Sequence, residues 1–381
     1  MRRLALLLCC ALAIAACSSS SKPAATGTSA TTSPAPTNAP TTSTVAIGPR
    51  AIGHVFVINL ENSNYDTTWG AKSPARYLNT TLLKQGKLLT QYHGIGHASL
   101  GNYIAEISGQ SPNPSTQSDC IQYIEFTPTG AGTGKYGQAL GKGCVYPKSV
   151  KTIADQLTAA GKTWRAYQED MGAPCRHPAI GANDTTIAPK PGDMYATRHD
   201  PFVYFHSIID SPTCAQNVVD FTRLATDVKS TATTPNFAFI TPNVCHDGHD
   251  APCVDGAPGG LVSADRFLST EVPKILASPA YKADGMLVIT LDEASITTTD
   301  ACCHTPASPN ADKPGLGGPG GGRIGTLLLS AQVKPGTTDA TPYNHYALLC
   351  SLENIFGLSH LGFAGAPGLT CFGKDVYDAS S

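Results

Sequence analysis

Short apolar runs alternate with amphipathic stretches along most of the chain. Runs rich in β-branched and other apolar residues, typical of buried parallel strands, occupy residues 54–60, 164–167, 237–240, 286–291 and 325–330. Stretches in which apolar residues recur every three or four positions, typical of amphipathic helices, occupy residues 149–160, 218–228, 264–276 and 345–356. This alternation predicts an α/β fold in which a mostly parallel sheet is sandwiched between helices.

The start of the chain lacks this alternation. Arg2 and Arg3 precede an apolar run over residues 4–16, which is too short to span a bilayer and is typical of a secretory signal. The run ends at Cys17 in a sequence that resembles the bacterial lipobox, whose cysteine carries the lipid of a lipoprotein. We predict a lipoprotein signal peptide at 1–16 and an exported protein anchored to the outer face of the cell membrane by a lipid on Cys17. An ordinary signal peptide with a chance cysteine is the alternative.

The segment after Cys17 has a composition of its own. Residues 17–46 consist almost wholly of Ser, Thr, Ala and Pro, with Lys22 as their only charge. Such a segment cannot bury enough apolar surface to offset its conformational entropy, so we predict a flexible tether. From residue 47 to residue 381 the composition is globular, and this range is the predicted catalytic domain.

Charge and cysteine content exclude some classes of protein. The chain has 26 Lys and Arg against 28 Asp and Glu, which excludes a polybasic nucleic-acid binder, and we expect no nucleic-acid partner. Ten of the 13 cysteines lie beyond residue 46, an even number that favours disulfides in an oxidising compartment. The adjacent Cys302 and Cys303 can bridge each other only through a strained ring. Because short loops close most easily, the other expected pairs are local: Cys120 with Cys144, Cys175 with Cys214, Cys245 with Cys253, and Cys350 with Cys371.

Polar side chains follow three of the predicted strands at the point where each strand ends. In open parallel sheets the ligand sits beyond the carboxyl ends of the strands, so these side chains are candidates for a shared site. Their oxygen and nitrogen atoms suit a hard divalent cation. A solvated surface is the alternative for any one group. The residues are Glu61, Asn62, His246, Asp247, His249, Asp250, Asp292 and Glu293.

Ser99 is a candidate nucleophile. It lies shortly before an apolar stretch at 104–107, which places it at or near the N-terminus of a helix, where backbone N–H groups favour an anion. A serine hydroxyl needs a base or a metal to become reactive, and the predicted cation would serve. The alternative is that Ser99 only caps the helix.

These residues fall in motifs that resemble those of the bacterial phosphoesterase family of acid phosphatases and phospholipases C, a branch of the alkaline phosphatase superfamily. The similar segments occur in the family's order, at residues 54–65, 97–109, 236–250, 291–293 and 343–358. Segments 168–170 and 198–202 look most like the secreted acid phosphatases that act as phosphatidylinositol 3-phosphate phosphatases. Ala98 and Gly101 stand where the family usually has proline, which implies a less rigid loop around Ser99.

The resemblance implies a role for each residue. It implies an alkaline-phosphatase-like fold in which Ser99 is phosphorylated during turnover, Asn102 holds a phosphate oxygen, and His97 belongs to the same catalytic group. An imidazolium among the pocket histidines would protonate the leaving group and favour activity below pH 7. The implied metal ligands are Glu61, Asn62, Asp292 and Glu293, and the resemblance implies one or two ions bound. The implied phosphate-pocket residues are His199, Asp247, His249 and His345.

We therefore expect an exported, metal-dependent phosphomonoesterase that works through a phosphoserine, with phosphoinositides as one candidate class of substrate. A phosphodiesterase of the phospholipase C type is an alternative, because it would share the metal and Ser99 but needs room for a second ester. A non-catalytic surface lipoprotein is the other alternative. The presence of both the nucleophile and the carboxylates disfavours it.

Overall fold

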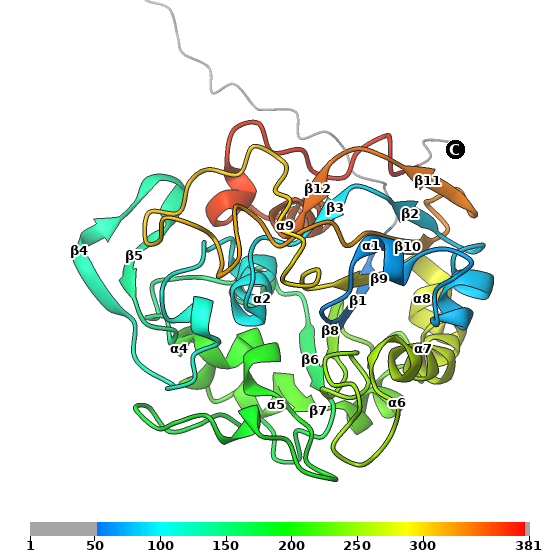
Figure 1. Ribbon diagram of the computed structural model, residues 1–381, viewed down its shortest axis with the longest axis horizontal. Helices are drawn as coiled ribbons and strands as arrows, with labels where there is room; N and C mark the ends of the chain where they lie inside the picture. The colour runs from blue at the N-terminus through cyan, green and yellow to red at the C-terminus, as the bar shows by residue number, and fades with distance from the viewer. Residues whose placement is uncertain (1–51, 378–381) are drawn as a thin grey trace, which may run out of the picture. The chain divides into compact units, whose positions relative to one another are not determined.

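The main sheet of this protein has eight strands in the order β11-β2-β10-β9-β1-β8-β6-β7, in a computed structural model that describes residues 52–377 (Figure 1). The strands from β9 to β7 run parallel to their neighbours, whereas β10 is antiparallel to both β9 and β2. The predicted α/β class with a mostly parallel sheet is thus confirmed. The strands are β1 (His54–Leu60), β2 (Lys87–Leu89), β6 (Trp164–Gln168), β7 (Val218–Asp220), β8 (Phe237–Thr241), β9 (Gly285–Leu291), β10 (Thr326–Ser330) and β11 (Thr337–Asp339).

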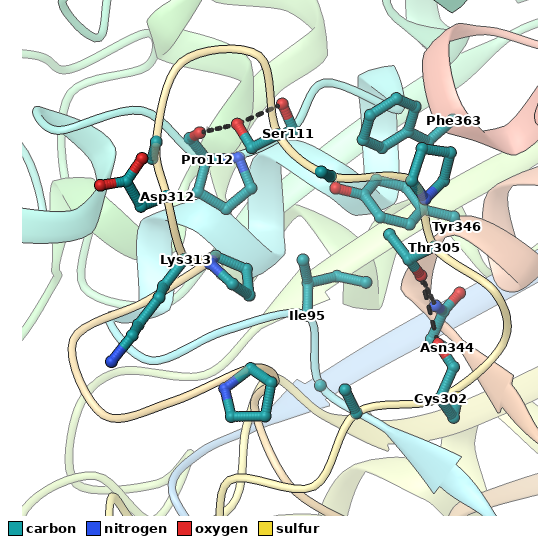
Figure 2. Close-up of a pocket in the computed structure, with 18 residues that line it drawn as sticks. Ile95, Ser111, Pro112, Cys302, Thr305, Asp312, Lys313, Asn344, Tyr346 and Phe363 are labelled. Atoms are coloured by element: carbon teal, nitrogen blue, oxygen red, sulfur yellow. Dashed lines mark hydrogen bonds between the residues drawn. The ribbon is translucent and has the colours of Figure 1, made fainter.

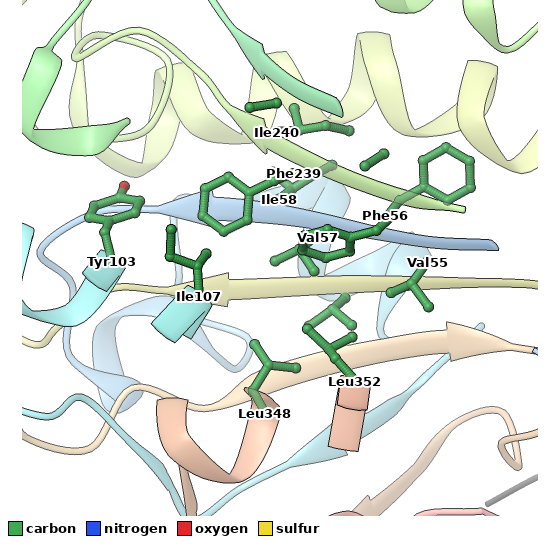
Figure 3. Packing of buried hydrophobic residues seen from close by; sticks show 14 of the residues in the cluster. Val55, Phe56, Val57, Ile58, Tyr103, Ile107, Phe239, Ile240, Leu348 and Leu352 are labelled. Atoms are coloured by element: carbon green, nitrogen blue, oxygen red, sulfur yellow. The ribbon is translucent and has the colours of Figure 1, made fainter. Parts of the chain in front are cut away.

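The centre of the core is β1, whose seven residues are all buried. In its register Ile58 lies between Ile289 of β9 and Ile240 of β8. Figure 3 shows Ile107 of α2 (Ser99–Ser108) and Leu352 of α9 (His345–Phe356) packed on one side of these strands. The long helix α7 (Gly260–Ala277) lies on the other side. Because both faces are covered, both sets of alternating side chains are apolar, which explains the unbroken apolar run in the sequence.

Shorter elements complete the fold. In the described part of the chain, α3 (Ile153–Ala159) packs with α2 and α9, and α8 (Pro279–Asp284) packs with α7. Two small ribbons lie outside the main sheet: β3 (Tyr92–His93) with β12 (Tyr343–Asn344), and β4 (Thr127–Thr133) with β5 (Ala139–Lys142). The other short helices are α1 (Tyr65–Thr68), α4 (His206–Ile209), α5 (Cys214–Asn217) and α6 (Leu224–Asp227).

Two of the predicted helices are placed differently by the structure. The helix expected at 218–228 is wrong in its first part, because residues 218–220 form β7 and pair with β6 at the edge of the sheet. Asp220 then accepts a hydrogen bond from Thr222 N, which starts a short 3₁₀ turn before α6. The helix expected from residue 149 begins only at Ile153, because Thr152 and Asp155 form a capping box there.

Five disulfides join the ten cysteines of the described region. All four predicted local pairs are confirmed, and Cys302 is bonded to Cys303. The predicted signal peptide, the lipid site at Cys17 and the tether lie outside the described residues and stay predictions. Within residues 52–377, no helix combines the length and the apolar character that crossing a membrane requires.

Candidate active site

The carboxyl ends of three parallel strands meet at one place, as the sequence predicts. Glu61 directly follows β1, and its backbone N–H donates to the carbonyl of Asp247, in the loop after β8, at 2.9 Å. The N–H of Asp292, directly after β9, donates to the carbonyl of Leu60 at 3.0 Å. These two bonds fix the spacing of the side chains that project beyond the sheet.

Three carboxylates are buried together at this point. Glu61, Asp247 and Asp292, here called the carboxylate cluster, are each at most 1% exposed. Burial, followed by the charges of Asp292 and Asp247, raises the pKa of Glu61 well above its ordinary value. Burial likewise raises the pKa of Asp247 and of Asp292. Such a cluster is costly to bury unless protons or a cation compensate its charge.

The carboxylate cluster fits a divalent cation. Oδ2 of Asp292 is buried and has no hydrogen-bond partner among residues 52–377, so it is free to act as a ligand. Asn62 directly follows Glu61, and its N–H donates to Oδ1 of Asp292 at 3.1 Å. Glu61, His199 and His249 also each bring one ligand atom within 4.8 Å of the others. Oxygen atoms with imidazole nitrogens suit divalent ions of the Mg, Mn and Zn type.

Ser99 faces the carboxylate cluster. Its hydroxyl donates to Oε2 of Glu61 at 3.1 Å, and it is the first residue of α2. The capping alternative for Ser99 is wrong, because the residue at the cap position is Ala98, with φ of 84° and no capping side chain. Asp119 instead accepts a hydrogen bond from Leu100 N at 2.9 Å. The side chain of Ser99 is therefore available for chemistry.

Asn102, His97 and Glu293 form a second group beside Ser99. Asn102 accepts hydrogen bonds from the N–H groups of Ile95 and Gly96, and it donates to Oε2 of Glu293 at 3.0 Å. His97 places Nε2 at 3.0 Å from the carbonyl oxygen of Thr298 and Nδ1 at 3.5 Å from Glu293. Asn102 and Glu293 thus hold the loop before Ser99. Of the predicted metal ligands, Asn62 and Glu293 line the cavity described below. The side chains of Asn102 and His97 are not part of its lining.

Two histidines, His199 between β6 and β7 and His249 after β8, lie beside the carboxylate cluster. His199 places Nδ1 at 3.0 Å from Oδ2 of Asp247 and Nε2 at 3.4 Å from Oε1 of Glu61. Burial, together with the nearby charges of Arg198 and His249, lowers the pKa of His199 well below its ordinary value. The Arg198 guanidinium donates to Nε2 of His249 at 3.2 Å. His199 is therefore a neutral ligand or hydrogen-bond partner.

His345 lies behind the site. Its Nε2 is 2.5 Å from the carbonyl oxygen of Asp292, and its Nδ1 is 2.9 Å from Oε1 of Glu106. Both ring nitrogens face acceptor oxygens, an arrangement that favours the charged form of the ring beside Glu106. Burial lowers the pKa of His345, but the Glu106 charge and these hydrogen bonds outweigh burial and raise it. The assignment of His345 to the phosphate pocket stays a prediction, and the structure shows that the side chain is wholly buried, with Nε2 facing the backbone of Asp292.

An open cavity of about 680 Å³ leads to Ser99. Its polar wall includes Asn62, Ser99, Asp119, Arg198, His249 and Glu293. A second, smaller cavity of about 140 Å³ lies beside Ser111, Tyr346 and Phe363 and contains no predicted site residue (Figure 2). The larger cavity is the candidate substrate site.

Sequence reasoning missed several polar residues of this cavity, among them Arg198 and Asp119. Arg198 directly precedes His199, but a lone arginine in a loop carries no signal of its own. Asp119 has φ of 52° and follows a 3₁₀ turn, and nothing in the sequence predicts that it meets the start of α2.

Fold and site together define an α/β protein in which a serine hydroxyl faces a buried carboxylate cluster, an arrangement suited to ester hydrolysis. The chain belongs to the Phosphoesterase family, whose model matches residues 77–359. A phosphate-repressible acid phosphatase from Penicillium chrysogenum is 28% identical over 284 residues, covering 74% of this chain and 54% of that protein. A phosphatidylinositol-3-phosphatase from Mycobacterium tuberculosis is 25% identical over 318 residues, covering 83% of this chain and 81% of that protein.

The coverage differs between these relatives. The chain spans between 54% and 60% of the length of the first three curated relatives that it matches, all of which are fungal acid phosphatases. Among solved structures, a protein of the alkaline phosphatase superfamily from Vibrio parahaemolyticus aligns with a TM-score of 0.43 and 12% identity, covering 82% of this chain and 68% of that one.

Proposed function

We propose that this protein is an exported, metal-dependent phosphomonoesterase of the acid phosphatase type that works through a phosphoserine on Ser99. The observation that carries the proposal is the hydrogen bond from the Ser99 hydroxyl to Glu61, beside the unpartnered oxygen of Asp292. Membership of the Phosphoesterase family and the names of the curated relatives support the same class of reaction.

The proposed metal ligands are Glu61, Asn62, Asp292 and, on the side of the histidines, His199. A divalent cation held there would lower the pKa of a serine hydroxyl and neutralise phosphate charge. Glu293 fits the metal site less well than the other three residues that the resemblance implies, because its carboxylate accepts a hydrogen bond from Asn102. We assign Glu293 to the support of the Ser99 loop.

The chain's own residues supply the remaining parts of the reaction. Ser99 begins α2, so the positive end of the helix dipole lies at the attacking oxygen and favours the transferred phosphoryl group. Glu61 accepts the hydrogen of the Ser99 hydroxyl and orients it for in-line attack. Arg198 lines the same cavity, and its guanidinium matches the charge and shape of a phosphate.

Proton transfer to the leaving alkoxide falls to His249 in this proposal. Burial and the charges of Arg198 and His249 lower the pKa of His199, so its ring is neutral and lacks the proton that an acid would donate. His249 lines the cavity, and its side chain is 29% exposed. Its Nδ1 lies 2.8 Å from Oδ1 of Asp250. A histidine that lines the cavity lies within reach of the leaving group, which a catalytic acid requires. Water then hydrolyses the phosphoserine from the vacated side.

Export and substrate are part of the proposal. Five disulfides support folding in an oxidising compartment, and the lipid on Cys17 stays a prediction. The Mycobacterium relative is named for phosphatidylinositol 3-phosphate, so phosphoinositides are a candidate substrate class here.

The test compares a monoester with a diester on the purified protein. We expect p-nitrophenyl phosphate to be hydrolysed, p-nitrophenyl phosphorylcholine to be a poor substrate, and EDTA to abolish activity until a divalent ion is restored. Ser99→Ala should lose at least about 10³-fold in kcat, because the variant has no hydroxyl at the start of α2 that could attack the phosphate. Ser108→Ala, at the other end of α2, is the matched control and should keep wild-type activity.

Several results would refute the proposal. A Ser99→Ala variant with more than about a tenth of wild-type activity would exclude the phosphoserine. A preference for the diester would favour a phosphodiesterase. A folded protein that hydrolyses neither substrate would favour a non-catalytic role.

A further inference from the structure

Four exposed aliphatic side chains surround the candidate substrate site. Among residues 52–377, seven large apolar side chains are exposed, and four of them line the 680 Å³ cavity. They belong to separate segments of the chain, so their grouping is not a consequence of sequence neighbourhood. Scattered exposed apolar residues need no explanation, but a cluster at one cavity indicates binding. This apolar rim consists of Ile121, Ile187, Ile296 and Leu316, with exposed fractions of 52%, 47%, 57% and 68%.

The cavity is divided between polar and apolar parts. Ser99, Arg198 and His249 lie in the part that the proposed reaction requires for the phosphate. A phosphate alone needs only hydrogen bonds and charge, and its polar oxygens gain nothing from contact with aliphatic side chains. The apolar rim therefore matches the other half of the substrate, the group attached through the ester oxygen.

The glycine-rich segment before β10 explains how the most exposed of these residues is held in place. The N–H of Leu316 donates to the carbonyl of His97 at 3.3 Å. A Cβ on Gly315 would lie only 2.0 Å from the backbone nitrogen of His97, so a residue with a side chain does not fit there. Glycine thus lets this segment lie flat against the backbone of the Ser99 loop. Leu316 follows Gly315 directly, and its side chain lines the cavity.

We propose that the apolar rim is a leaving-group subsite, and that the preferred substrates are phosphomonoesters whose leaving group carries an aliphatic chain. The inference rests on the proposed phosphomonoesterase activity and adds the chemistry of its substrate. The aliphatic chain of the leaving group contacts Ile121, Ile187, Ile296 and Leu316 while the phosphate lies at Ser99.

The experiment uses a series of n-alkyl phosphates from ethyl to octyl, each below its micelle-forming concentration, with phosphate release as the readout. A methylene moved wholly out of water changes an equilibrium about fourfold, and one buried to half that extent changes it about twofold. We expect kcat/KM of the wild-type protein to rise about twofold for each methylene, or about 60-fold between ethyl and octyl phosphate.

Paired variants locate the effect. In the double variant Ile296→Ser, Leu316→Ser, the ratio of kcat/KM for octyl to ethyl phosphate should fall to below about tenfold, because half of the apolar rim is lost. The matched control is Ile180→Ser, Val262→Ser. These two residues are 44% and 47% exposed but lie outside the cavity, so the control should keep the wild-type ratio.

Each outcome supports or overturns the inference. Hydrolysis of ethyl phosphate without any increase along the series would overturn the leaving-group subsite and leave the proposed function intact. Failure to hydrolyse any monoester would instead overturn the proposed function. A flat series with monomers, combined with faster hydrolysis of a phosphomonoester lipid in phosphatidylcholine vesicles, would show that the rim docks on a lipid surface and would also overturn the proposal.

Discussion

Glu353 offers a direct test of the electrostatics of this fold, away from the active site. It lies on α9 and is wholly buried. Oε1 accepts a hydrogen bond from Leu361 N at 2.8 Å, whereas Oε2 has no hydrogen-bond partner among residues 52–377. Burial, opposed only in part by that hydrogen bond, raises the pKa of Glu353 from 4.5 to about 9. The folded protein therefore holds this carboxyl as the neutral acid at neutral pH.

The consequence for stability has a definite sign. The unfolded chain releases this proton above pH 4.5, while the folded protein keeps it until about pH 9. The contribution of Glu353 to the free energy of unfolding is therefore highest below pH 4.5, and it declines as pH rises toward 9. At about 1.4 kcal/mol per pH unit, the loss at pH 7 is about 3 kcal/mol.

Glu353→Gln should remove this loss. Glutamine keeps the oxygen that accepts from Leu361, has the same shape, and is uncharged in both states. We expect the variant to be more stable than the wild-type protein by about 3 kcal/mol at pH 7 and equally stable at pH 4. An exposed control, Asp255→Asn, should differ from wild type by less than about 0.5 kcal/mol at both pH values.

The assay is urea unfolding between pH 4 and pH 8, with disulfides intact and EDTA present in every sample. Because the other titrating groups are common to both proteins, the difference between variant and wild type isolates Glu353. Two parallel stability curves, or a variant less stable than wild type at pH 7, would refute the assignment of a neutral buried carboxyl.

Three further predictions concern the metal, the anchor and the loop after β8. Asp292→Asn should lower bound divalent metal, measured by elemental analysis, together with activity, and a metal-free but fully active wild-type protein would contradict this. Cys17→Ser should move the protein from the membrane fraction to the soluble fraction, and unchanged partitioning would exclude the lipid anchor. Replacing Cys245 and Cys253 by alanine should cost about 2 to 3 kcal/mol of stability and lower activity, because the disulfide closes the loop that carries His249. Wild-type activity in that variant would show that the loop holds its shape without the bond.

The main strands could be predicted because each is long enough and apolar enough to leave a pattern. Residues 54–60 and 286–291 lie in strands that are buried on both faces of the sheet, so their sequence is continuously apolar. Residues 218–220 could not be assigned in the same way. Three residues show neither a period of two nor a helical period, and only their pairing with β6 makes them a strand.

The site divides in a similar manner. The meeting of Glu61, Asp247 and Asp292 could be predicted, because the carboxyl ends of neighbouring parallel strands lie at one edge of a sheet. Arg198 and Asp119 could not, since each lies in a loop and acts through partners that are distant in sequence. The apolar rim was not predictable either, because four single aliphatic residues in loops have no shared pattern until the fold brings them to one cavity.

The pair formed by Glu106 and His345 shows how the fold links the candidate nucleophile to the proposed metal ligands. Ser99 and Glu106 lie two turns apart on α2, so one rigid helix holds both the candidate nucleophile and the carboxylate that orients His345. His345, at the start of α9, then donates to the carbonyl of Asp292. A buried ion pair is costly unless its hydrogen bonds are satisfied, and here Asn59 also donates to Glu106 at 2.9 Å. The distance between Ser99 and Asp292 is therefore set by a chain of buried polar contacts as well as by the sheet, which is what alignment of an attacking oxygen with a bound phosphate requires.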